Sequence, residues 1–223
     1  MKLWGYSSVF FAMTLPCAGL YAQGPPPPTH TFRDSTYHIS FDYPSNWTLS
    51  HTDHEISTFH LDARSAPRNA ALRGVVAMPE NPFPESTFSG AYLYFSVTPH
   101  SSKASCAKQA VPRRSSSRKP ATTQIADIPF THGHDEQRGI CIIQRDETYI
   151  TNRRGACYRF DLAINNFCGG EVSGVKSISP QELDQVRSRL ESILSTIRFD
   201  PKGSPKSTDN PTSGALETAN TFP

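Results

Sequence analysis

Cysteines are the sequence feature that most limits how this chain can fold. Of its five cysteines, Cys17 lies near the N-terminus and the others follow much later, at Cys106, Cys141, Cys157 and Cys168. An even set of cysteines in an exported chain is typical of disulfide bonds, whereas the same residues in a reducing compartment stay free. The first residues of the chain decide between these two cases.

Residues 1–22 have the layout of a secretory leader. Lys2 supplies a positive charge, residues 9–15 form a short apolar core, and Ala22 is a small residue suited to signal peptidase. The core is shorter than the roughly 20 apolar residues of a membrane span. We therefore expect cleavage after Ala22, a secreted or periplasmic protein, and no transmembrane segment in the mature chain. Lipidation at Cys17 is the alternative, and it fits less well because Pro16 stands where a small residue is usual.

The four cysteines that remain after cleavage allow three disulfide pairings. A hairpin with arms at residues 139–150 and 156–164 would bring Cys141 and Cys168 near each other at its open end. Cys157 lies near the turn of that hairpin and is then left for Cys106. We favour Cys141–Cys168 with Cys106–Cys157, and the other two pairings stay open. Zinc binding is disfavoured because the chain has no C-x-x-C motif.

Composition divides the chain into four parts. After the leader, residues 23–35 contain four consecutive prolines and indicate a stiff, extended spacer. Residues 200–223 have almost no large apolar side chains, so they cannot offset their ordering entropy and are expected to be disordered. A single folded domain should occupy residues 36–199. The formal net charge of +2 is too small for general nucleic-acid binding.

Hydrophobic periodicity predicts mostly strands within this domain. Apolar and polar residues alternate over 37–43, and 55–61 repeats the pattern. Residues 91–97 form the strongest predicted strand, and 139–150 and 156–164 form a long hairpin joined by a turn at 152–155. Helices are expected at 102–110 and from Ser179 to Leu194, where Ser179, Pro180 and Glu182 form a capping box. A short strand at 196–199 follows. These elements predict an α+β fold in which an antiparallel β-sheet packs with helices.

Two segments carry a resemblance to a known family. The run from Tyr37 to Trp47, which includes Phe-Asp-Tyr-Pro-Ser-Asn-Trp, resembles the opening strand-turn-strand of PsbP-like exported domains. The run from Leu190 to Phe199 resembles their final helix and strand. The resemblance implies a PsbP-like α/β/α sandwich and a non-enzymatic binding or accessory role, and it transfers no catalytic residue. The four cysteines and the basic insertion lie outside the family pattern.

Histidines raise the question of a metal site. His51, His54 and His60 gather near one predicted strand pair, and His132 and His134 form a second group. Imidazoles with nearby carboxylates could hold a divalent ion, so a metal-binding protein or a metal-dependent hydrolase is the alternative function. Histidines at the surface without a metal are the favoured interpretation, and we expect no cofactor.

Basic residues suggest a second kind of site. Residues 103–119 contain no acidic side chain, and two arginines follow at the hairpin turn. The candidates for contact with an anionic partner are Arg113, Arg114, Arg118, Lys119, Arg153 and Arg154. Salt would weaken such a contact. The mature sequence has no serine-hydrolase elbow, zinc-protease motif or phosphate-binding loop. We therefore predict an exported, non-enzymatic binding or accessory protein, with a structural envelope protein as a further alternative.

Overall fold

The computed structural model describes residues 28–53, 67, 69–110, 120–167 and 174–200 of the chain. The strands are β1 (Thr29–Asp34), β2 (Ile39–Pro44), β3 (Thr48–Ser50), β4 (Ala71–Ala77), β5 (Phe88–Thr98), β6 (Ala121–Ile125), β7 (Ile128–Gly139), β8 (Ile142–Arg153), β9 (Ala156–Phe167) and β10 (Arg198–Phe199). The helices are α1 (Lys103–Ala107), the short 3-10 helix η2 (Lys108–Ala110) and α2 (Pro180–Leu194).

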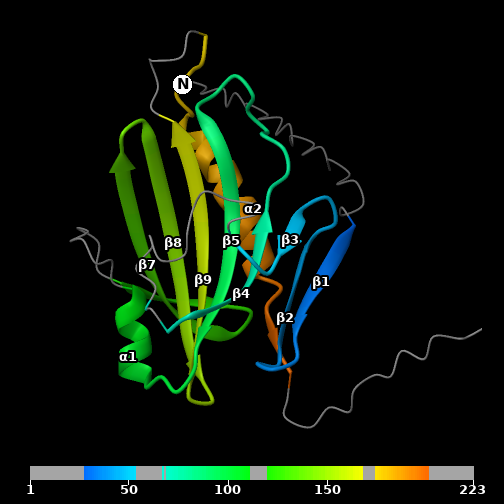
Figure 1. Cartoon of the computed structure of the whole chain (residues 1–223), viewed down its shortest axis with the longest axis vertical. Helices are drawn as coiled ribbons and strands as arrows, with labels where there is room; N and C mark the ends of the chain where they lie inside the picture. The colour runs from blue at the N-terminus through cyan, green and yellow to red at the C-terminus, as the bar shows by residue number, and fades with distance from the viewer. Residues whose placement is uncertain (1–27, 54–66, 68, 111–119, 168–173, 201–223) are drawn as a thin grey trace, which may run out of the picture.

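The described strands form two antiparallel sheets. The small sheet has the order β1-β2-β10, and the large sheet has the order β3-β4-β5-β9-β8-β7-β6. Helix α2 crosses behind the large sheet, and the small sheet lies beside it (Figure 1). Cys157 of β9 is bonded to α1, while the next residue, Tyr158, joins the core that contains α2. Because neighbouring strand residues point to opposite faces, the two helices cover opposite faces of the large sheet. The chain thus has the predicted α+β fold.

The main core lies between the large sheet, α2 and the small sheet. Phe95 of β5 and Phe160 of β9 stack with ring centroids 4.9 Å apart. Phe41 of β2 meets both rings edge-on, at 6.2 Å from each. Leu190 of α2 is fully buried in the same cluster. Aromatic side chains from three strands therefore hold the small sheet against the large one.

Helix α2 begins where the capping box predicts. The Ser179 hydroxyl accepts a hydrogen bond from the backbone N–H of Glu182 at 3.2 Å, and the Glu182 carboxylate accepts one from the N–H of Ser179 at 2.7 Å. The stripe of Val186, Leu190 and Leu194 is buried. The predicted helix is thus confirmed. It could be predicted because its signals lie within the helix itself.

The predicted long hairpin is also confirmed, as β8 and β9. Their ladder continues to the pair Arg153 and Ala156, so the turn consists of Arg154 and Gly155 alone. Both turn residues have positive φ, at 51° and 74°. This is the backbone of a two-residue type I′ turn, which matches the twist of the flanking strands.

The prediction of a proline-rich spacer over residues 23–35 is wrong from Thr29 onward, because Thr29–Asp34 forms β1. Phe32 stacks on Phe41 of β2 with ring centroids 4.7 Å apart, and Asp34 binds the Arg73 side chain at 2.6 Å. Strand β1 pairs with β2 along its whole length, and its contact with Arg73 joins it to a residue far away in the sequence, which local composition does not reveal. The fold also extends one residue beyond the predicted end, because the backbone N–H of Asp200 donates to the carbonyl of His38.

Three strands of the large sheet, β4, β6 and β7, were not predicted. Strand β7 is the most polar of them, and its last eight residues read His-Gly-His-Asp-Glu-Gln-Arg-Gly. The leader, the predicted strand at 55–61 and the tail from residue 201 lie outside the described residues. Among the described helices, none is long and apolar enough to cross a membrane.

Candidate functional site

The turn between β8 and β9 presents two predicted site residues, Arg153 and Arg154, both exposed. The guanidinium carbon of Arg153 lies 4.5 Å from the ring centre of Phe199, a cation–π contact. Arg154 donates a hydrogen bond to the carbonyl oxygen of Asp200 at 3.2 Å. Neither guanidinium forms an ion pair with a carboxylate in the part of the chain that the structure describes. A stacked guanidinium keeps its in-plane donors available for a carboxylate or phosphate.

This turn is attached firmly to the helix beside it. Cys157, the second residue of β9, forms a disulfide with Cys106 of α1. The backbone N–H of Ser101 donates to the carbonyl of Gly155 at 2.8 Å, and the side-chain amide of Asn152 donates to the carbonyl of Ser101 at 2.8 Å. The backbone that carries both arginines is therefore held in place, which lowers the ordering cost of binding a partner.

A groove of about 320 Å³ lies next to this turn, between α1 and strands β6, β7 and β8. Lys103 and Asn152 line it, and Phe130 and Ile150 contribute apolar lining. Lys103 is exposed and adds a third cation near the turn. We call Lys103, Arg153 and Arg154 the cationic end.

The remaining predicted cations lie outside the described residues: Arg113, Arg114, Arg118 and Lys119. The helix that precedes them, η2, packs closely on β7. A Cβ added at Gly133 would lie 1.9 Å from the carbonyl oxygen of Ala110, so only glycine allows this approach. The middle residue of the His-Gly-His sequence therefore has a packing role.

His132 and His134, which flank this glycine, lie together on the opposite face of β7 and bind one carboxylate. His132 Nε2 lies 2.7 Å and His134 Nδ1 2.8 Å from the two oxygens of Glu147 on β8. Because an ionised carboxylate only accepts hydrogen bonds, both imidazoles are donors here. The His132 ring also stacks on Tyr149 at 4.5 Å. The described residues contain no group of three or more metal-ligating side chains that could hold an ion.

Helix α2 closes over this histidine cluster. The Tyr149 hydroxyl donates to the Glu191 carboxylate at 3.1 Å, and Arg187 Nε lies 3.8 Å from Glu147. Burial opposes ionisation of Glu147, but the hydrogen bonds and charges of His132 and His134 outweigh it and lower its pKa to about 2. The cluster therefore connects α2 to strands β7 and β8.

This pKa predicts how stability changes in acid. A carboxyl group whose pKa is lowered by folding stabilises the protein above its unfolded pKa of 4.5, and this stabilisation is lost as the pH falls towards 2. We expect the loss to be on the order of 3 kcal/mol and to be largely absent from the Glu147→Gln variant. Urea unfolding of both proteins between those pH values measures it. Parallel pH dependences in the two proteins would contradict the assignment.

The other metal candidates do not join this cluster. His51 follows β3, and its Nδ1 lies 2.7 Å from the carbonyl oxygen of Arg73. Strands β3 and β7 are separated by β4, β5, β9 and β8, so about 24 Å lies between them at the usual strand spacing. His54 and His60 lie outside the described residues. A joint site of His51 with His132 and His134 is therefore excluded by geometry.

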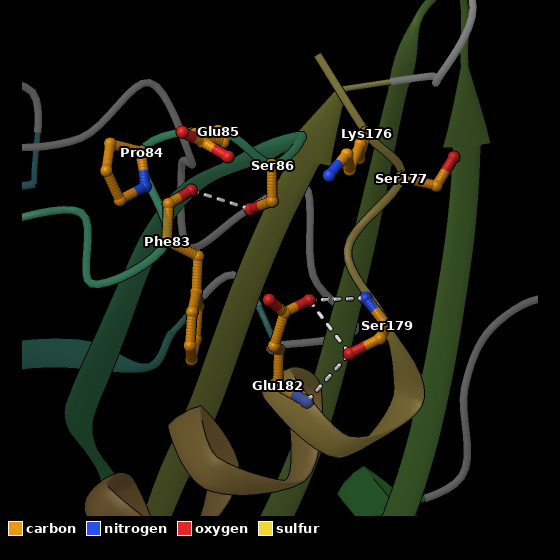
Figure 2. Close-up of a pocket in the computed structure, with 8 residues that line it drawn as sticks. All are labelled: Phe83, Pro84, Glu85, Ser86, Lys176, Ser177, Ser179 and Glu182. Carbon is orange, nitrogen blue, oxygen red and sulfur yellow. Dashed lines mark hydrogen bonds between the residues drawn. The ribbon is translucent and has the colours of Figure 1, made fainter.

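A pocket of about 460 Å³ opens at the other end of the sheet, at the start of α2 (Figure 2). It is lined by Phe83, Pro84, Glu85, Ser86, Lys176, Ser177, Ser179 and Glu182. Figure 2 shows the capping box at its base, where Glu182 already accepts from both the N–H and the hydroxyl of Ser179. Those hydrogen bonds lower the Glu182 pKa. The helix start is thus occupied by the protein's own carboxylate, which disfavours an anionic ligand there.

Sequence reasoning missed the buried charges of β9. Arg159 and Asp161 lie two residues apart on the face that carries α1, and both are fully buried. Arg159 Nε donates to the two carboxylate oxygens of Asp161 at 2.9 Å and 3.0 Å, and Arg159 Nη1 donates to the carbonyl of Gln109 at 3.1 Å. Burial alone would lower the pKa of Arg159. The negative charge of Asp161 and its hydrogen bonds outweigh burial and raise that pKa. The signal that could have revealed these buried charges is the run Tyr-Arg-Phe-Asp-Leu, in which charged residues alternate with apolar ones along a predicted strand.

The second predicted disulfide is only partly described. Cys141 is disulfide-bonded, and its partner lies outside the described residues. The pair Ile142 and Phe167 ends the described ladder of β8 and β9, and Cys141 directly precedes Ile142 in the chain. The Cys141–Cys168 bond therefore stays a prediction.

No protein-family model and no curated protein matches this chain. Among solved structures, a crystal structure from Bacteroides thetaiotaomicron VPI-5482 is similar at 11% identity and a TM-score of 0.44, covering 78% of this chain and 49% of that one. This chain thus matches about half the length of the Bacteroides protein.

Two further solved structures are similar over most of their own length. The solution structure of cyanobacterial PsbP (CyanoP) from Synechocystis sp. PCC 6803 has 11% identity and a TM-score of 0.44, covering 77% of this chain and 92% of that one. LpqN, involved in cell envelope biogenesis of Mycobacterium tuberculosis, has 10% identity and a TM-score of 0.39, covering 78% and 86%. These identities carry over no functional residue. A PsbP domain, from the family that the sequence resembles, is thus among the solved structures similar to this chain.

Proposed function

We propose that this chain is an exported, non-enzymatic binding protein whose cationic end contacts an anionic partner. The observation that carries the proposal is the pair Arg153 and Arg154. Both are exposed, neither forms an ion pair within the described residues, and their turn is held to α1 by the disulfide between Cys106 and Cys157. A buried disulfide supports an oxidising compartment, which agrees with the leader-like sequence of residues 1–22.

The packing of each arginine agrees with a binding role. Arg153 gains a rigid platform from Phe199, and Arg154 uses one donor on the Asp200 carbonyl. Guanidinium groups have five N–H donors, so most of them stay available for carboxylate, sulfate or phosphate oxygens. Lys103 adds a point charge beside the same turn. Segment 111–119, which lies outside the described residues, follows η2 in the sequence and carries the other predicted cations.

The test is binding of fluorescein-labelled polyglutamate, measured by fluorescence anisotropy at low and high salt. We expect salt-sensitive binding that weakens at least tenfold in Arg153→Glu/Arg154→Glu, because two attractions become repulsions. The matched control is Arg138→Glu, which reverses an arginine that is 71% exposed but already paired with Glu136. Equal loss in both variants, or no binding by the unmodified protein, would reject the proposal. A variant with alanine at Arg113, Arg114, Arg118 and Lys119 then measures how much the basic segment contributes to the affinity for polyglutamate.

A further inference from the structure

The far end of the large sheet, opposite the cationic end, exposes three large hydrophobic side chains. Ile140 is 98% exposed, Phe167 51% and Ile142 40%. Ile142 and Phe167 are direct partners in the β8–β9 ladder, and Ile140 lies in the turn that precedes Ile142. Single exposed apolar residues are common, but three at one end of the same strands mark an interaction surface. We call these residues the apolar tip.

The turn that carries Ile140 is unusual in its chemistry. Gly139 pairs with Ile142, so the turn between β7 and β8 consists of Ile140 and Cys141 alone. Two-residue turns strongly favour asparagine and glycine, yet here an isoleucine is followed by a cysteine with φ of 55°. A positive φ disfavours a cysteine, and the disulfide bond of Cys141 gives the turn an added constraint. The chain thus holds an almost fully exposed hydrophobic side chain in this turn.

Basic side chains lie on two sides of the apolar tip. Arg138 precedes it on β7, with a side chain that is 71% exposed. Lys176 lies on the other side, because the backbone of Thr87 accepts a hydrogen bond from the N–H of Phe167 and donates one to the Lys176 carbonyl, and Glu85 and Glu182 line the same pocket as Lys176. Glu136 pairs with Arg138 and also with Arg145, which leaves this cluster of three with one net positive charge.

We propose that the apolar tip inserts into the boundary between the headgroups and acyl chains of a phospholipid bilayer. An exposed isoleucine in a two-residue turn needs no complementary pocket in a fluid interface, whereas a protein partner would have to supply one. Apolar burial drives such binding, and nearby arginine and lysine side chains reach lipid phosphates. This surface is independent of the cationic end, which lies at the other end of the same strands (Figure 1).

The experiment is co-sedimentation of the mature protein with vesicles of pure phosphatidylcholine and, separately, of phosphatidylcholine and phosphatidylglycerol in equal parts. We expect association with both kinds of vesicle. The vesicle affinity of Ile140→Ser should fall roughly tenfold, because the substitution removes one fully exposed apolar side chain from the contact with lipid. The side chain is exposed, so Ile140→Ser should unfold at the same temperature as the unmodified protein. Ile140→Trp should show a blue-shifted tryptophan emission when vesicles are added.

The control variant is Arg153→Glu/Arg154→Glu, which leaves the apolar tip intact. It should keep its binding to neutral vesicles, whatever happens to its binding of polyglutamate. Either proposal can therefore be rejected without rejecting the other. Three results would overturn the insertion: no association with either vesicle, equal association of Ile140→Ser, or association with anionic vesicles alone that this arginine variant abolishes. The last result would assign lipid contact to the cationic end.

Discussion

Asp161→Asn is expected to destabilise the protein by about 3–5 kcal/mol, because it leaves the buried Arg159 guanidinium without its main counter-charge. Asp161 is completely buried, and it also accepts a hydrogen bond from Thr148 at 3.0 Å. The next acidic group, Asp146, lies 3.9 Å from Arg159, too far for a hydrogen bond. Urea unfolding of the two proteins measures the difference as a shift of the midpoint at unchanged slope.

The matched control is Asp42→Asn, the same change at an exposed ion pair. Asp42 binds Arg198 at 2.8 Å, but the Arg198 side chain is 56% exposed, so we expect a loss of at most about 1 kcal/mol. A double-mutant cycle with Arg159→Met adds a second check. The combined variant should lose less than the two single variants together, since each single change strands a buried charge. Additive losses, or equal losses at Asp161 and Asp42, would contradict this account.

Replacing both Cys106 and Cys157 with alanine is expected to lower the free energy of unfolding by about 4 kcal/mol. The disulfide closes a loop of 51 residues, and its loss restores conformational entropy to the unfolded chain. Both cysteines are fully buried, so each alanine also removes apolar contact between α1 and the sheet.

Thermal unfolding without reductant provides the measurement. The double variant should unfold about 10 °C below the unmodified protein. A change within about 1 kcal/mol would show that α1 is held by its packing alone. Because the same disulfide holds the turn of Arg153 and Arg154, the double variant should also bind polyglutamate more weakly. Unchanged binding would show that the cationic end does not depend on this disulfide.

Elements with internal signals could be predicted from the sequence. The capping box of Ser179 and Glu182 lies within one helical turn, and the turn that joins β8 to β9 is made by neighbouring residues. Sequence spacing also proposed the bond between Cys106 and Cys157, which the structure contains. Elements that depend on distant partners were missed. Strand β7 is polar because Glu147 satisfies its histidines on one face, and no local pattern shows that.

The candidate sites follow the same division. Arg153 and Arg154 could be named from a basic pair at a predicted turn, but their stacking on Phe199 and contact with Asp200 join residues far apart in sequence. Ile140 fell inside a predicted hairpin arm, where an apolar side chain is expected to be half-buried. Its near-complete exposure depends on where β7 ends and turns, which the register with β8 decides.

The sequence by itself determined helix α2 and the β8–β9 hairpin, because each depends on residues close together in the chain. Only the tertiary structure decided which faces are covered and which charges are buried. Register and packing set those outcomes, and both depend on pairs such as Phe32 with Phe41 and Cys106 with Cys157. A one-residue shift of register would move every side chain of a strand to the other face, so burial and exposure follow from the assembled sheet.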